Sequence, residues 1–235
     1  MLSTLSFDSV SLESWGLYIT DAGVYEAPQL DYTSYQIPGR SGDLIVYNGR
    51  YRNILVRYPC VIPDNFDENF QKVRYTILSR PRYCEIRDGF FPDRFRMGIY
   101  RSGLNPTTKV DRNSGYFDIV FDCAPQWWLD EGQVAQVMQN GGTISNPTMY
   151  DAKPILRIGG NGEVTIGDTV ITTSGVPANK TCVIDCESGI ISDGDITNFS
   201  QYVTIDGDLP VLPNGSTEIG LSGASLSIIP RWYEL

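Results

Sequence analysis

Residues 39–43, Gly39-Arg40-Ser41-Gly42-Asp43, combine a glycine-rich turn with a guanidinium, which are features that hold phosphate groups in many proteins. A P-loop, however, follows its glycines with a Lys-Ser/Thr pair and a helix, and a dinucleotide-binding loop also leads into a helix. Here the following residues alternate like strands on either side of Asn48-Gly49, the strongest short hairpin signal in the sequence. The stretch therefore predicts a turn followed by a β-hairpin, and we interpret Arg40 as reaching a neighbouring protein.

Arginines alternate with aromatic residues in three segments, residues 49–58, 79–83 and 92–101. Positive charge beside aromatic rings can hold single-stranded nucleic acid. Acidic residues nearly balance the arginines in the same part of the chain, however, and nucleic acid needs a net basic surface. We therefore expect these arginines to form salt bridges between subunits, or to stack on tyrosines in a protein interface.

The sequence contains no histidine, which removes the commonest general base and the commonest metal ligand. Carboxylate pairs occur at Asp185 with Glu187 and at Asp206 with Asp208, and such pairs can bind calcium or hydrolyse glycosides. Alternating carboxylates on a strand or turn are more commonly a solvated face. We predict that the chain is not an enzyme and that it holds no metal ion and no cofactor.

Two aromatic pairs suggest carbohydrate binding as an alternative function. Trp127-Trp128 ends a predicted strand, and Trp232-Tyr233 lies close to the end of the sequence. Exposed aromatic rings beside polar groups can stack on sugars, although aromatic residues at strand ends more often pack in a core. A carbohydrate-binding module that attaches to cell-wall polysaccharide is therefore the alternative, with Trp128 or Trp232 as its cue.

The spacing of the cysteines does not match a set of disulfides or a metal site. Cys182 and Cys186 would lie about 13 Å apart along one strand, too far to share a disulfide or a metal ion. We expect all five to be reduced and mostly buried, as in a protein made in a cytosol, at positions Cys60, Cys84, Cys123, Cys182 and Cys186. The first residues lack the basic start and apolar stretch of a secretory signal, and no run approaches the ~18 apolar residues of a membrane span.

One segment predicts a helix among many short strands. Within residues 64–80, apolar residues recur at helical spacing at Phe66, Phe70, Val73 and Ile77. We expect this stripe to pack the helix onto a β domain. Asp64 suits the cap at its start, and Arg80-Pro81 suits its end. Residues 28–38 alternate as an extended strand, either at a sheet edge or in a long arm.

Charge divides the chain into two parts. Residues 1–130 hold 14 basic and 16 acidic side chains, whereas residues 131–235 hold 4 basic and 12 acidic ones. Short strands at regular spacing from residue 146 onward are typical of an antiparallel sandwich. We therefore predict a β domain over residues 1–130, a linker or crossover over 131–145, and a β-sandwich over 146–235. The acidic balance, a net charge of -10, would let DNA slide past without being captured.

The order of several motifs resembles the distal tail protein (Dit) family of long-tailed, non-contractile bacteriophages, the siphophages. These motifs are a Pro-Gly-Arg turn at 38–40 before Asn-Gly, Phe-x-x-x-Pro-Gln at 121–126, Asn-Pro…Ala-x-Pro-Ile at 146–155, and Pro-Arg-Trp at 230–232. The resemblance extends over essentially the whole length. It implies a mostly β protein with a tail-tube-like N-terminal β-sandwich or barrel domain containing one α-helix, and a C-terminal galectin-like antiparallel β-sandwich.

The resemblance also implies a structural virion protein at the distal end of the tail, in the baseplate, made in the host bacterial cytoplasm. Its copies would form a hexameric ring that joins the tail tube protein above to the tail-associated hub protein below, and genomic DNA would pass through the ring. Receptor-binding proteins are a further candidate partner in host adsorption. We expect the contact surface with these partners to comprise Pro38, Gly39, Arg40, Ser41, Gly42, Asp43, Arg50, Tyr51 and Arg52.

Overall fold

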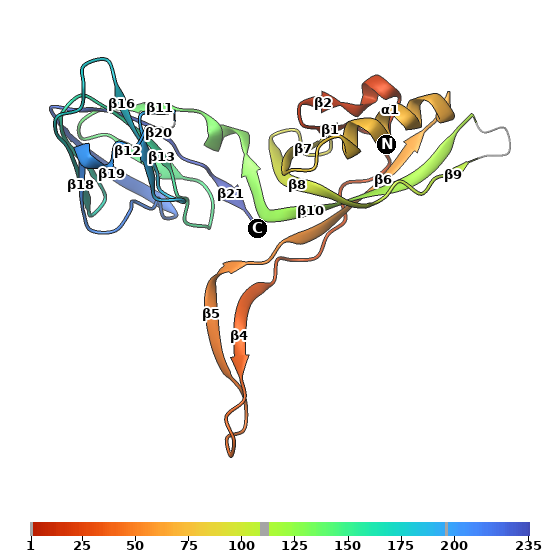
Figure 1. Cartoon of the computed structure of the whole chain (residues 1–235), viewed down its shortest axis with the longest axis horizontal. Coiled ribbons are helices and arrows are strands. Elements are labelled where there is room, and N and C mark those ends of the chain that lie inside the picture. The colour runs from red at the N-terminus through yellow and green to blue at the C-terminus, as the bar shows by residue number, and fades with distance from the viewer. Residues whose placement is uncertain (1, 109–112, 196) are drawn as a thin grey trace. The chain divides into compact units, whose positions relative to one another are not determined.

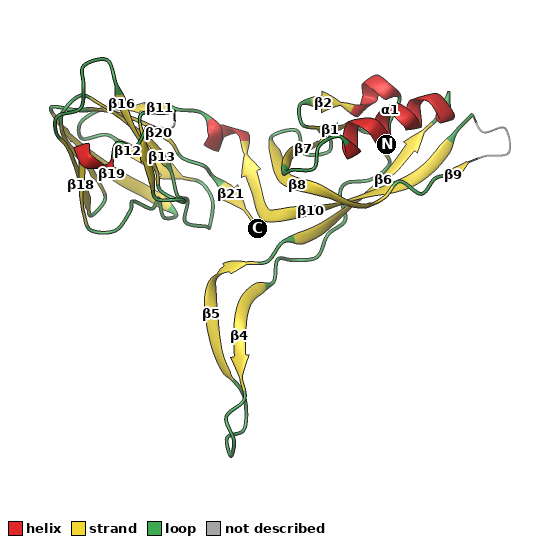
Figure 2. Cartoon of the chain, in the orientation of Figure 1, coloured by secondary structure: helices red, strands yellow, loops and turns green. Residues whose placement is uncertain are grey.

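The computed structural model describes residues 2–108, 113–195 and 197–235. The chain divides into two compact units, which meet in the sequence between Trp127 and Trp128. Strands dominate both units, and α1 (Phe66–Leu78) is the one α-helix in the described part of the chain (Figures 1 and 2). Short 3-10 helices occur at Leu12–Trp15 (η1), Asp130–Gln133 (η2) and Ser200–Tyr202 (η3). The mostly β fold class predicted from the sequence is confirmed.

The first unit is built on one sheet in the order β2-β1-β7-β8-β10-β6-β3, with β9 beside β10. Buried residues alternate with more exposed ones along β10, which directs Phe117, Ile119 and Phe121 into the core. The strands of this sheet are β1 (Leu5–Phe7), β2 (Val10–Ser11), β3 (Tyr18–Ile19), β6 (Ile54–Ile62), β7 (Cys84–Asp88), β8 (Arg94–Gly103), β9 (Thr107–Thr108) and β10 (Gly115–Leu129).

Helix α1 packs its apolar stripe into the core of this unit, as its spacing predicts. Its four stripe residues are at most 7% exposed. The rings of Phe66 and Phe70 stack 5.1 Å apart, and both meet Phe117 of β10 edge-on. The predicted cap at Asp64 is wrong. Its carboxylate accepts the N–H of Asn65, just outside the helix, and Asn65 itself precedes the helix in a left-handed conformation.

The hairpin predicted at Asn48-Gly49 is also wrong. Strand β5 (Leu44–Tyr51) continues through this dipeptide and pairs with β4 (Leu30–Tyr35), and the chain reverses at residues 36–43 instead. The register between the two strands shifts beside Asn48-Gly49, because Tyr32 faces Tyr47 whereas Leu30 faces Tyr51. Gly49 has a φ of 74°, so the dipeptide forms a bulge. A positive φ serves a bulge as well as a hairpin turn, and the dipeptide alone does not distinguish them.

The ribbon of β4 and β5 extends away from the sheet of the first unit (Figure 1). We call residues 30–51, which are these two strands and the loop between them, the arm. None of its residues belongs to the core of that unit. The arm accounts for the long extended strand expected at residues 28–38.

The second unit is a sandwich of two five-stranded sheets around one core. One sheet has the order β11-β20-β13-β16-β17 and the other β12-β19-β14-β15-β18. Residues 131–145 contain the end of η2, β11 and most of β12, and these two strands pair with β20 and β19. The strands of these two sheets are β11 (Gln136–Met138), β12 (Thr143–Asn146), β13 (Ile155–Gly159), β14 (Gly162–Ile166), β15 (Thr169–Thr173), β16 (Thr181–Asp185), β17 (Ile190–Ser192), β18 (Val203–Asp206), β19 (Gly215–Ser222) and β20 (Ser225–Ile229). Strand β21 (Tyr233–Glu234) belongs to neither sheet and pairs with β10.

Candidate assembly interface

The residues predicted to contact partners lie at the two ends of the arm. Residues 38–43 form the loop at its tip, whereas Arg50, Tyr51 and Arg52 lie at its root (Figure 1). Gly39 and Gly42 have φ angles of 78° and 84°, so the tip uses glycine for its backbone conformation. The structure therefore does not bring the predicted residues together. The single contact surface predicted from the sequence is therefore two surfaces, one at the tip of the arm and one at its root.

The arm exposes large apolar side chains on both of its faces. Leu44 and Val46 lie on one face, and Ile45 and Tyr47 on the other, because neighbouring residues of a strand point in opposite directions. A lone two-stranded ribbon is marginally stable in water, and an exposed apolar patch is typical of an interaction surface. The apolar residues of the arm, each 40–54% exposed, are Leu30, Tyr32, Tyr35, Ile37, Leu44, Ile45, Val46 and Tyr47.

At the root of the arm, one carboxylate holds two arginines. Arg50 Nε donates to Asp31 Oδ2 at 2.7 Å, and Arg52 Nε donates to Asp31 Oδ1 at 3.1 Å. The hydrogen bond from Arg50, followed by that from Arg52, holds the pKa of Asp31 below its usual value. The side chains of Arg50 and Arg52 remain 72% and 54% exposed. The cluster therefore ties β4 to β5 and still presents positive charge to solvent.

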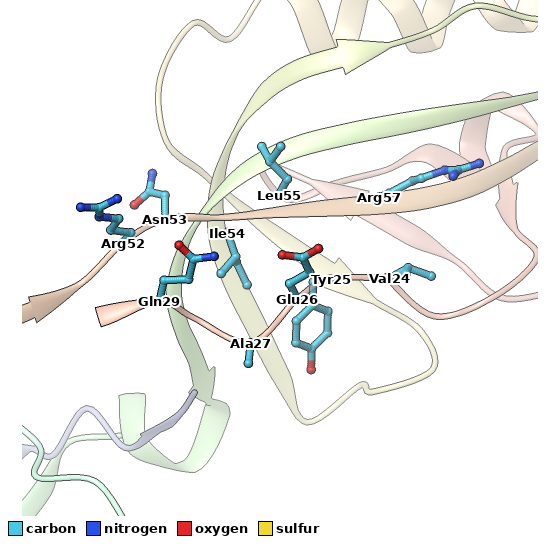
Figure 3. A pocket seen from close by; sticks show the side chains of 10 residues that line it. All are labelled: Val24, Tyr25, Glu26, Ala27, Gln29, Arg52, Asn53, Ile54, Leu55 and Arg57. Carbon is cyan, nitrogen blue, oxygen red and sulfur yellow. The ribbon is translucent and has the colours of Figure 1, made fainter. Parts of the chain in front are cut away.

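The two strands that lead into the arm separate before they reach it. Val24 and Arg57 exchange two backbone hydrogen bonds, and Arg52 N–H donates to Gln29 O. Between these points, where all residues are described, no pairing joins the two strands. Pro28 has no N–H and cannot continue the ladder. The separation leaves a pocket of about 450 Å³ (Figure 3). We call it the root pocket, and it is lined by Val24, Tyr25, Glu26, Ala27, Gln29, Arg52, Asn53, Ile54, Leu55 and Arg57.

A buried arginine holds the segment that enters the arm. Arg96 of β8 is only 2% exposed, and its guanidinium carbon lies 4.2 Å from the ring centre of Tyr25 and 4.5 Å from that of Trp127. Its Nη1 and Nη2 find no hydrogen-bond acceptor in the described part of the chain. Nearby, Asp88 accepts the N–H of Gly23 at 3.1 Å, and burial raises the pKa of Asp88. Arg96 was expected on an interface surface and is instead a core residue, because the rings that cover it come from distant parts of the sequence.

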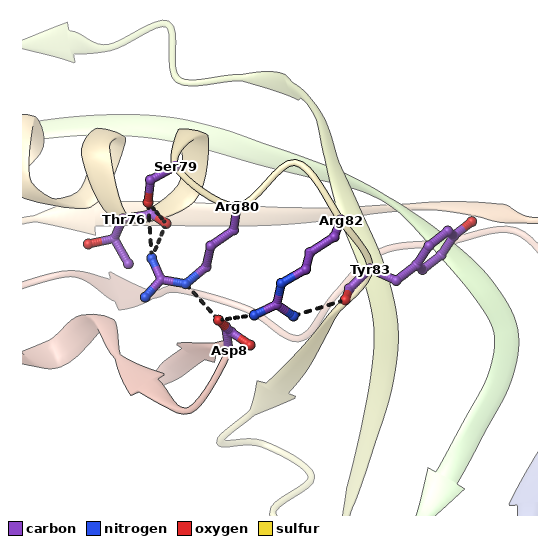
Figure 4. Close-up of polar contacts among 6 residues, drawn as sticks. All are labelled: Asp8, Thr76, Ser79, Arg80, Arg82 and Tyr83. Carbon is purple, nitrogen blue, oxygen red and sulfur yellow. Dashed lines mark hydrogen bonds and ion pairs between the residues drawn. The ribbon is translucent and has the colours of Figure 1, made fainter. Parts of the chain in front are cut away.

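Arginines of the second predicted segment also serve the fold. Arg80 Nε donates to Asp8 Oδ2 at 2.8 Å, and Arg82 Nη2 donates to the same oxygen at 2.9 Å (Figure 4). The hydrogen bond from Arg80 is the main reason why the pKa of Asp8 is lowered. Arg80 Nη1 also donates to the carbonyl of Thr76 in the last turn of α1. These contacts join the helix end to the β1–β2 turn, so both arginines have partners within the unit.

One of the two candidate carboxylate pairs has a basic partner within the chain. Arg231 pairs with Asp185 and Glu187, both at 3.1 Å. No cluster of three or more potential metal-ligating side chains occurs among the described residues.

All five cysteines are buried and form no disulfide, and burial raises the pKa of Cys123 and Cys186 to about 12. No described helix has the length and apolar character needed to cross a bilayer.

The two tryptophans that suggested carbohydrate binding are occupied by packing contacts in the folded chain. Trp232 is only 2% exposed in the core of the sandwich, so its ring cannot stack on a sugar. Trp128 packs against Tyr233 at 5.4 Å, and Arg231 lies over its ring at 5.3 Å. Both tryptophans thus have the packing role that aromatic residues at strand ends usually have.

Comparison with solved structures identifies the fold. The chain is similar over its whole length to the SPP1 Dit protein (gp 19.1), described as a paradigm of the hub adsorption apparatus in phages that infect Gram-positive bacteria. The TM-score is 0.68, the sequence identity is 11%, and each chain is covered completely. The chain has the Dit fold. This finding confirms the fold that the sequence resemblance implies.

A second similarity is to the phage P2 baseplate in its activated conformation with Ca. The TM-score is 0.50 at 12% identity, and 97% of this chain and 98% of the other are covered. No protein-family model and no curated protein matches the sequence. The Dit fold is therefore present in a sequence that shares only 11–12% identity with these two chains.

Proposed function

We propose that this chain is a non-enzymatic structural subunit at the distal end of a siphophage tail, where six copies form a ring. The observation that carries the proposal is the arm, a ribbon that extends from the first unit with eight large apolar side chains 40–54% exposed. Such a ribbon gains stability only when a partner covers it. The Dit fold over the whole chain supports a phage tail hub as the place where that partner is found.

In this proposal the arm of each copy contacts the next copy. A contact between two different surfaces repeats head to tail, and it closes into a ring when the rotation between copies allows. The ring would join the tail tube protein to the tail-associated hub protein, and the second unit would offer a place for receptor-binding proteins. Genomic DNA would pass through the ring without specific binding, in keeping with the net charge of -10.

The test is the mass of the full-length chain in solution, measured over a wide range of concentrations, together with negative-stain images. The proposal predicts ring-shaped particles with the mass of six copies, either from the chain alone or after co-expression with the neighbouring tail proteins. A chain that stays monomeric at every concentration, and forms no ring beside those proteins, would contradict the proposal.

A further inference from the structure

We propose that the root pocket receives the arm tip of a second copy of this chain. This inference rests on the proposed ring and adds the place where the arm docks. Two charged side chains without a polar side-chain partner, an open strand edge and exposed apolar residues support it.

Most charged side chains of the arm and its root have a polar partner within the chain. Asp31 holds Arg50 and Arg52, Arg57 pairs with Asp118 at 2.6 Å, and Asp43 accepts a hydrogen bond from Ser34. Among the charged side chains of residues 22–57, all of them described, this leaves two without a side-chain partner. These are Arg40 at the tip and Glu26 in the root pocket, one of each sign.

Arg40 and Glu26 cannot meet within one copy. About ten residues of extended strand separate the tip from the root, which corresponds to roughly 30 Å. The two charges can therefore pair only between copies, with the tip of one arm at the root of the next. Because tip and root are different surfaces, this contact repeats head to tail, as a ring requires.

The backbone of the root pocket offers an open strand edge. Arg57 directs its N–H and C=O towards Val24, and residues two apart on a strand face the same edge, so Leu55 directs its N–H and C=O into the pocket. In the described part of the chain, no strand pairs with β6 on this edge beside Leu55. The backbone of an incoming segment can hydrogen-bond to the N–H and C=O of Leu55.

The apolar parts of the two surfaces also match. Val24 and Leu55 line the root pocket and are 60% and 56% exposed. Ile37 and Leu44 flank the tip and are 40% and 43% exposed. Docking would cover all four side chains and bring Arg40 close to Glu26.

A charge exchange in the full-length chain tests the docking. Arg40→Glu and Glu26→Arg, made singly, place like charges at the contact and should each raise the concentration needed for half-assembly by about tenfold. The double variant restores an opposite pair and should return assembly to within about threefold of the wild type. Ring formation is measured as mass in solution, and circular dichroism checks that each variant is folded.

The matched control reverses Glu13 and Arg74, which are exposed charges of the same unit with no ion pair among the described residues. Glu13→Arg and Arg74→Glu should leave assembly unchanged. The docking site would be wrong if Arg40→Glu and Glu26→Arg each assemble like the wild type, or if the double variant assembles no better than the single variants. Either result would leave the proposed ring itself standing. Failure of the wild-type chain to form any ring would instead overturn the proposed function and this inference with it.

Discussion

Removal of the arm separates its role in assembly from its role in folding. The variant replaces residues 30–51 by Asn-Gly, which links Gln29 to Arg52, two residues already joined by a backbone hydrogen bond. No deleted residue belongs to the core of the first unit. Loss of the solvent-screened Asp31 cluster costs little, because exposed ion pairs contribute little to stability, and the shorter connection stabilises by roughly 1–2 kcal/mol. The free energy of unfolding should therefore stay within about 1 kcal/mol of the wild type.

The effect on assembly should be much larger. Eight apolar side chains of the arm are about half exposed, and covering the exposed half of each is worth about 1 kcal/mol, or about 8 kcal/mol per arm. Association itself costs roughly 4–15 kcal/mol, so one arm contact is close to balance. In a closed ring the last copy makes two such contacts for one loss of freedom, which favours the ring over open chains. We therefore expect wild-type assembly to be cooperative, with few species between monomer and ring, and the deletion variant to remain monomeric.

Thermal unfolding and mass in solution are measured on the same samples. Val137→Ser is the control for a general loss of exposed apolar surface, because Val137 is 81% exposed in the second unit. The control should assemble as the wild type does. Rings formed by the deletion variant at wild-type concentrations would refute the role of the arm. A loss of more than about 2 kcal/mol in unfolding free energy would show that the arm is part of the folding core.

Three further predictions concern single residues. Arg96→Lys should lower the free energy of unfolding by about 2 kcal/mol, because an ammonium cannot stack on both rings, and Arg96→Met should cost less because it also removes a buried charge; equal losses in thermal unfolding would contradict this. Ser9→Gly should stabilise by about 0.5–1 kcal/mol, since Ser9 has a φ of 64° in the β1–β2 turn, whereas Ser9→Ala should bring no gain in the same measurement. Ionised Asp31 stabilises the arm above its unfolded pKa near 4, and this contribution is lost as pH falls through the lowered folded pKa; amide exchange of the arm should show that loss, and Asp31→Asn should abolish its pH dependence.

The sequence was informative where a local pattern has one physical meaning. The stripe of α1 can be buried only as a helix, and its four residues are in the core. Alternation at residues 28–38 predicted an extended strand, and β4 lies within that segment. Asn48-Gly49 misled because its positive φ fits two structures, and only the pairing of β4 with β5 decides between a turn and a bulge.

The candidate site was harder to predict because its parts are brought together by tertiary contacts. The sequence singled out the tip and root residues but placed them in one surface, since the length of the ribbon depends on the turn at 36–43. Glu26 had no local signal at all. Its significance arises only when the other charged side chains are seen to have polar partners: Arg50 and Arg52 on Asp31, Arg57 on Asp118, and Asp43 on Ser34. Whether a charged side chain has a polar partner is a property of the folded chain. Here two such side chains without one, of opposite sign and held roughly 30 Å apart by a ribbon, indicate a contact that only another copy can complete.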